Sequence, residues 1–185
     1  MKVVFKKIRV GDIFSFYVGN DLYAFARLIY FVERSFYITE VFNYKSSDGF
    51  FNSDVLSAPR LIRLVPINYL VNMNKKLWNW KVVYRDFNFQ PPIEEISNLE
   101  FSVGLGQAIR YNTNWTDGSS EMRLLSRDVS IEEASKLESS DIQMNTHWLY
   151  IRIRELWNLK PFEWESSADM WNWFHENGLY FTDHK

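Results

Sequence analysis

The sequence predicts an α+β protein that is mainly β, and three observations support this class. Hydrophobic residues make up 46% of the 185 residues and aromatic residues 18%, which favours a folded chain rich in strands and large buried rings. Stretches of β-branched and aromatic residues alternate with short turns in the first half. The chain closes on helix signals, so we expect a bent antiparallel sheet or partial small barrel, then a mixed part ending in a helix.

The first half contains the strand signals. Strands are predicted at residues 3–5, 13–18, 22–32, 36–44, 60–65 and 78–87. Gly19-Asn20-Asp21 supplies the left-handed conformations that a tight hairpin needs, and residues 46–49 form a second turn cluster. Pro66 is expected to end the strand at 60–65, because proline cannot donate to a strand ladder.

The first hairpin has particular residue roles. Gly11 is expected to adopt an unusual backbone conformation before the strand, and the Asp12 carboxylate to accept hydrogen bonds from nearby turn amides. The hairpin aromatics alternate along the chain and are expected to share one face; they are Phe14, Phe16, Tyr23 and Phe25.

Gln90-Pro91-Pro92 is the predicted boundary between a β-rich domain at residues 1–92 and an acidic, aromatic α+β extension at 93–185. The two parts are either separate or packed into one continuous domain. Beyond the boundary, residues 101–111 are predicted to be extended, and Ser130 with Glu133 forms a capping box that opens a helix through about residue 137.

Two further elements are predicted near the end of the chain. Apolar Leu149, Ile151 and Ile153 alternate with polar neighbours, which is the period of a half-buried strand. The last element is a predicted helix that Ser166 or Ser167 caps and Gly178 ends; its apolar stripe comprises Met170, Trp171 and Phe174.

The small net charge of −2 conceals an asymmetry between the two halves. Residues 1–95 hold 13 lysine and arginine against 9 aspartate and glutamate, a net charge of +4, whereas residues 96–185 hold 8 against 14, a net charge of −6. An acidic surface of this kind is either a solvated face or a site that steers a basic partner. The predicted partner-binding carboxylates are Glu132, Glu133, Glu138 and Asp141.

The last helix adds two candidate contacts. Trp171 and Trp173 are two positions apart, so they lie about 200° apart around a helix and cannot both face the core. We expect Trp173 to be exposed beside Glu176, because an exposed tryptophan commonly anchors an interface.

The sequence gives little support for catalysis, metal binding or nucleic-acid binding. There is no cysteine, and the three histidines show no metal-ligand spacing, so we expect neither a metal nor a cofactor. The basic charge of the first half is too small for a polyphosphate footprint. No apolar stretch reaches the length of a membrane span, and the composition predicts a cytoplasmic protein with no membrane partner.

Several ordered fragments resemble the immunity protein 26 family, whose members are thought to protect bacteria against toxins of polymorphic toxin systems. The resemblance covers roughly residues 5–95, and the fragments that carry it are residues 11–14, 23–27, 65–69, 80–83 and 91–92. It implies a cytoplasmic protein that is not an enzyme. Such a protein would bind a cognate toxin, for example a basic nuclease, and occlude its active surface.

A binding module for carbohydrates or other small ligands is the alternative function. The chain has eight tryptophans, and exposed tryptophans serve as stacking platforms for sugars and bases as well as interface anchors. The two functions differ in whether the tryptophans are buried in the core or lie on the surface.

Overall fold

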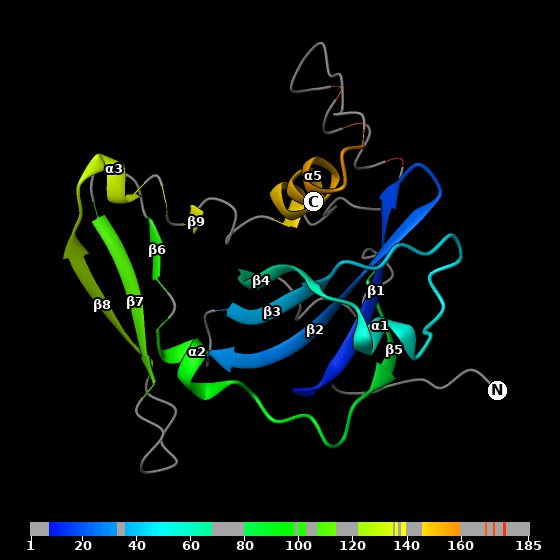
Figure 1. The fold of residues 1–185 in the computed structure, drawn as a ribbon, viewed down its shortest axis with the longest axis horizontal. Coiled ribbons are helices and arrows are strands. Elements are labelled where there is room, and N and C mark those ends of the chain that lie inside the picture. Colours follow the sequence, from blue (N-terminus) through cyan, green and yellow to red (C-terminus); the bar gives the residue numbers. More distant parts are fainter. Residues whose placement is uncertain are drawn as a thin grey trace, which may run out of the picture.

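The structure is a computed structural model in which the chain forms two β-sheets joined by short helices, with a longer helix over the first sheet (Figure 1). It describes residues 8–32, 36–67, 80–98, 100–102, 107–113, 122–134, 136, 138–139, 146–159, 169, 172 and 176. The predicted strand at residues 3–5 lies outside the described residues.

The first sheet is antiparallel and has the strand order β4-β3-β2-β1-β5. Its strands are β1 (Asp12–Gly19), β2 (Leu22–Val32), β3 (Phe36–Phe42), β4 (Arg60–Ile67) and β5 (Lys81–Arg85). The predicted mainly β, α+β class is confirmed, as is the antiparallel sheet in the first half. The sheet is open, with β4 and β5 at its edges, and it does not close into a barrel.

One prediction about the outer strand β4 is wrong. Pro66 lies within this strand, opposite Ile38, so it does not end the strand. Because β4 is an edge strand in the described sheet, a residue without an N–H group can be accommodated on its open side.

The hairpin turn and the start of β1 have the expected backbone. Gly19, Asn20 and Asp21 have φ angles of 90°, 56° and 52°, and Gly11 has a φ of 86°. The Arg9 amide donates to Oδ2 of Asp12 at 2.9 Å. These predictions are therefore confirmed, and they follow from the few residue types that tolerate positive φ.

The β1–β2 hairpin buries both of its faces. Phe16 lies opposite Ala24, whereas Phe25 lies opposite Ser15, and directly opposite residues share a face. Phe14 and Phe16 of β1 therefore point to the face opposite that of Tyr23 and Phe25 of β2, and the expectation of one shared face is wrong. Helix α5 packs on the Phe16 side, while residues around α1 (Asp54–Ser57) pack on the Phe25 side.

The turn over the Phe25 side leads to a first stability prediction. Gly49 has a φ of 68°, and an added Cβ would lie 2.6 Å from Cδ1 of Tyr23 and 2.7 Å from Oγ of Ser15. Gly49→Ala should therefore lower the free energy of unfolding by about 1–3 kcal/mol, measured by urea denaturation. Ser47→Ala, at an exposed position of the same turn, is the matched control. Equal stability of the two variants would contradict this account.

The second sheet follows the predicted boundary. Helix α2 (Ile93–Ser97) begins directly after Pro92, and the sheet has the order β8-β7-β6-β9. Its strands are β6 (Glu100–Ser102), β7 (Gln107–Thr113), β8 (Met122–Asp128) and β9 (Glu138–Ser139), with β9 parallel to β6. The extended stretch predicted at 101–111 is thus two antiparallel strands.

Between β8 and β9 lies α3 (Ile131–Ala134), which begins where the capping box predicts. The Glu133 amide donates to Oγ of Ser130 at 3.1 Å, which satisfies one of the free amides of the first helical turn. The described helix ends at Ala134, three residues earlier than predicted.

Helix α5 (Thr146–Leu156) replaces the strand predicted around residues 149–153, so that prediction is wrong. Leu149, Tyr150, Ile153 and Trp157 are buried, and their spacing is that of one helix face. They join the core of the first sheet, so part of the second half packs on the first. The division at residue 92 stays a prediction.

The predicted last helix is described at only three positions. Asp169, Asn172 and Glu176 are helical and exposed. The expected caps, apolar stripe and terminal glycine lie outside the described residues.

Candidate functional site

The predicted acidic surface is centred on α3, at the far end of the second sheet from α2 (Figure 1). Glu132 is 82% exposed, and its Oε1 accepts a hydrogen bond from Nζ of Lys136 at 2.8 Å. Glu133 lies beside it in the first helical turn, and Asp128 at the end of β8 is also exposed. Two of the predicted carboxylates are therefore neighbours on one surface turn.

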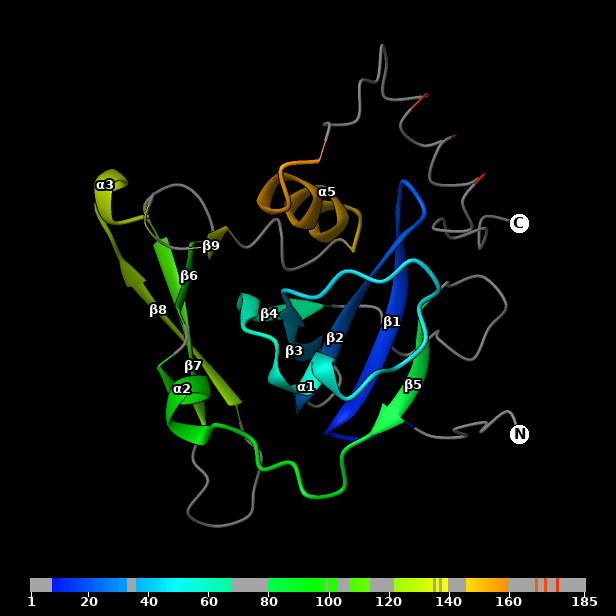
Figure 2. The ribbon, with the colours of Figure 1, turned by 45° about the vertical axis from the view of Figure 1, so that its right-hand side comes forward.

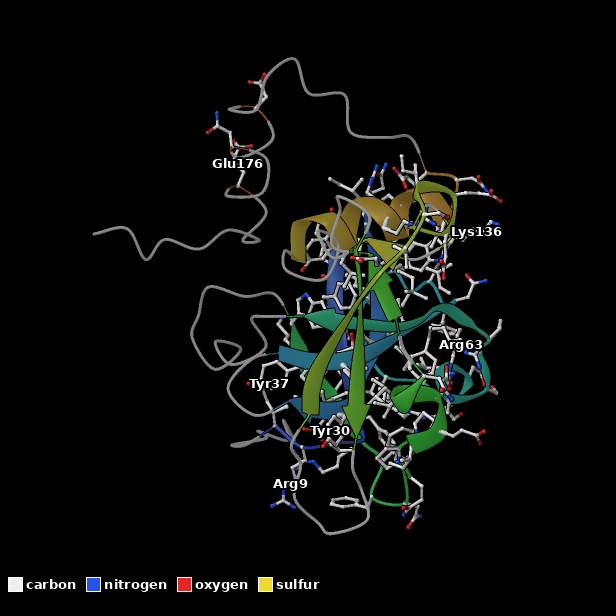
Figure 3. All side chains as sticks on the ribbon, turned by 90° about the vertical axis from the view of Figure 1, so that its left-hand side faces the viewer. Arg9, Tyr30, Tyr37, Arg63, Lys136 and Glu176 are labelled. Carbon is white, nitrogen blue, oxygen red and sulfur yellow. The ribbon has the colours of Figure 1, made fainter. Side chains whose placement is uncertain are left out.

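The other predicted contacts are not gathered there. Glu138 lies in β9, where its backbone pairs with Phe101 of β6. Glu176 is exposed, and Figure 3 shows it well apart from Lys136. Asp141 and Trp173 lie outside the described residues.

One apolar residue on α3 was not predicted to contribute. Ile131 is 86% exposed, and it is followed in sequence by two carboxylate residues. A large apolar side chain that remains in water within a charged surface is a feature of binding surfaces. The sequence offered a signal, since the apolar residue at the first helical position lacks an apolar partner one turn later.

Two tryptophans belong to the core of the first sheet. Trp80 is 1% exposed, its ring stacks on Phe16 with centroids 4.0 Å apart, and its Nε1 donates to the Tyr150 hydroxyl. Trp157 is also buried, and its Nε1 donates to Oδ1 of Asn43 at 3.0 Å. The carbohydrate-binding alternative therefore cannot use either ring as an exposed platform.

A charged cluster, which we call the arginine cluster, crosses the first sheet and was not predicted. It comprises Arg27 of β2, Glu40 of β3, Arg60 and Arg63 of β4, and Glu95 of α2. Glu40 is 2% exposed and pairs with Arg27 at 3.3 Å and with Arg60. The Arg27 guanidinium also lies over two rings, 5.1 Å from the Phe42 centroid and 4.5 Å from the Phe89 centroid.

Burial governs the protonation of this cluster. It raises the pKa of Glu40 above its ordinary value, while the Arg60 and Arg27 guanidinium groups oppose that rise. It also lowers the pKa of Arg27, against the opposing effect of Glu40 and Asp86. The two guanidinium groups therefore favour the ionised form of the buried Glu40 carboxylate.

The described residues give no sign of a metal site or a membrane span. Among them, no group of three or more histidine, aspartate or glutamate side chains is placed to hold a metal ion. No helix within the same residues is both long enough and apolar enough to cross a membrane.

Comparisons with known proteins leave the family open. No protein-family model, no curated protein and no solved structure matches this chain.

Proposed function

We propose that this protein is a bacterial immunity protein that binds a cognate toxin and occludes its active surface. The mechanism is steric and electrostatic, needs no cofactor, and operates in the cytoplasm of the protected cell. The toxin is a basic protein such as a nuclease, whose active surface must attract phosphate groups and so carries the charge that an acidic surface complements.

The resemblance to the immunity protein 26 family supports the class of this proposal. Four of its five fragments coincide with the start of β1 and with parts of β2, β4 and β5 in the first sheet, and the fifth, residues 91–92, directly precedes α2. Many residues in these fragments are buried, including Ile13, Phe14, Phe25 and Trp80. The resemblance therefore concerns the scaffold, and the toxin contact belongs to exposed groups.

The observation that carries the proposed contact is the α3 surface. Exposed Glu132 and half-buried Glu133 directly follow the exposed apolar residue Ile131 in α3, so an apolar side chain and two carboxylates share one helical turn. Carboxylates at the rim of an interface accelerate encounter with a basic partner, while an apolar anchor slows dissociation. Glu138, Asp141, Trp173 and Glu176 stay predicted contacts, and Glu176 lies well apart from Lys136 after α3.

Charge reversal on α3 tests this contact. In the double variant Glu132→Lys and Glu133→Lys, the association rate with the toxin should fall by roughly tenfold or more at low salt, because steering is lost. Stopped-flow fluorescence at several salt concentrations measures this rate and its salt dependence.

The matched control is Asp54→Lys, which reverses the charge of an exposed side chain on α1, the helix that packs on the first sheet. It should leave the association rate within about twofold of the parent, because exposed charges beyond a Debye length are screened. An unchanged rate in the α3 double variant would show that the toxin uses another face.

A further inference from the structure

The second sheet is held between two helices that pack on the first sheet. Helix α2 directly precedes β6; it lies between the two sheets in Figure 1 and at the lower end of the second sheet in Figure 2. Helix α5 follows β9 in the chain and packs on a different core cluster of the first sheet from the one that α2 contacts. The position of the second sheet therefore depends on how firmly these two helices are docked.

The two helices are docked by different interactions. Helix α5 contributes Leu149, Tyr150 and Ile153 to the main core, all fully buried. Helix α2 contributes Ile96, which is fully buried against residues of β2, β3 and β4, while Glu94 on the same helix is exposed. The described apolar contact of α2 with the first sheet is thus the smaller one, and ion pairs of Glu95 lie beside it.

The charged contact of α2 is the Glu95 carboxylate. Nη1 of Arg60 donates to both of its oxygens at 2.9 Å, and Nε of Arg63 pairs with Oε1. Arg60 also pairs with Glu40, so the docking of α2 is continuous with the arginine cluster of the first sheet. Arg63 is 76% exposed, which leaves this end of the contact open to salt.

We propose that α2 is an electrostatic latch: the ion pairs of Glu95 with Arg60 and Arg63 fix the second sheet against the first, and their loss lets the second sheet move. Because β6 begins three residues after α2 ends, undocking of α2 is transmitted directly to the sheet that carries α3. The latch thereby sets the distance between the α3 surface and the first sheet, with or without a bound partner.

Distance measurement on the protein alone tests the latch. The chain has no cysteine, so Lys81→Cys on β5 and Lys136→Cys after α3 place two spin labels at exposed positions. The parent should give one narrow distance distribution by electron paramagnetic resonance. Glu95→Gln should add a second population of label-to-label distances. In the parent, about 1 M sodium chloride should add the same population, because the salt screens the ion pairs.

Hydrogen exchange gives an independent readout of the same event. The Ile96 amide donates to the Pro92 carbonyl at 3.0 Å, and in Glu95→Gln it should exchange at least about tenfold faster than in the parent. Glu94→Gln, on the exposed side of the same helix, is the control for loss of helix charge and should change both measurements less than Glu95→Gln does.

Two results would overturn the latch. One is an unchanged distance distribution and unchanged Ile96 exchange in Glu95→Gln. The other is an equal change in Glu94→Gln, which would assign the effect to helix charge in general. Should Glu95→Gln fail to fold, the parent in about 1 M sodium chloride must give the second population instead.

Discussion

Arg27→Ala should lower the free energy of unfolding by about 3–5 kcal/mol at neutral pH, because it leaves the buried Glu40 carboxylate with one of its two arginines. The guanidinium that lies between the Phe42 and Phe89 rings is lost at the same time. Urea denaturation of the variant and the parent measures this difference.

The same variant should show a distinctive pH dependence. Burial already raises the pKa of Glu40 above 4.5, and Arg27 opposes that rise, so removing Arg27 raises the pKa further. A raised folded-state pKa means that the folded state binds the proton more tightly than the unfolded state. The loss of stability is therefore largest above the folded pKa and shrinks as the pH falls through it towards the unfolded value.

Arg63→Ala is the control for Arg27→Ala, since Arg63 belongs to the same cluster but is mostly exposed. Arg63→Ala should lower the free energy of unfolding by less than about 1 kcal/mol, and this loss should change little with pH. A loss for Arg27→Ala that is as small as the control, or that grows as the pH falls, would contradict the account of a buried and interdependent cluster.

Trp80→Ala should lower the free energy of unfolding by a comparable amount, about 3–5 kcal/mol. It removes the indole from the contact between the first sheet and α5 and leaves a cavity there. The indole stacks on Phe16 of β1 and donates to the hydroxyl of Tyr150 on α5. Its removal should also increase hydrogen exchange in α5 before the rest of the sheet opens.

Tyr150→Phe separates the hydrogen bond from the packing around Trp80. It keeps the ring at the core but leaves the indole N–H without this acceptor, so the expected cost is about 1–3 kcal/mol. If Tyr150→Phe were as damaging as Trp80→Ala, the hydrogen bond and not the apolar contact would hold α5 in place.

The first sheet could be predicted from the sequence because its signals are local. Period-2 aromatic residues define the strands, and Gly19, Asn20 and Asp21 are residue types that tolerate positive φ. The pairing of faces could not be predicted, because it depends on the register between strands. A hairpin buried on both faces carries apolar residues on both faces, so its alternation has no unique phase.

Helix α5 shows how an apolar pattern can mislead. Leu149, Ile151 and Ile153 alternate as in a strand, but Leu149, Ile153 and Trp157 also repeat every fourth residue. The helical pattern is the one that the core uses, with Ile151 only partly buried. When a short apolar run fits both periods, tertiary packing decides whether it forms a strand or a helix.

The candidate site was predictable only in part. Glu132 and Glu133 are adjacent in sequence and follow a capping residue, so their position on one helical turn could be expected. The arginine cluster joins residues 27, 40, 60 and 95, which are distant in sequence and meet only through strand pairing and the docking of α2. Nothing in the local sequence marks these residues as partners.

The most direct test of the proposed function is calorimetry between this protein and the product of the adjacent upstream reading frame. The account predicts nanomolar, salt-sensitive association, together with loss of that product's toxicity when the two are produced in one cell. Absence of association with the product of any neighbouring gene would contradict it.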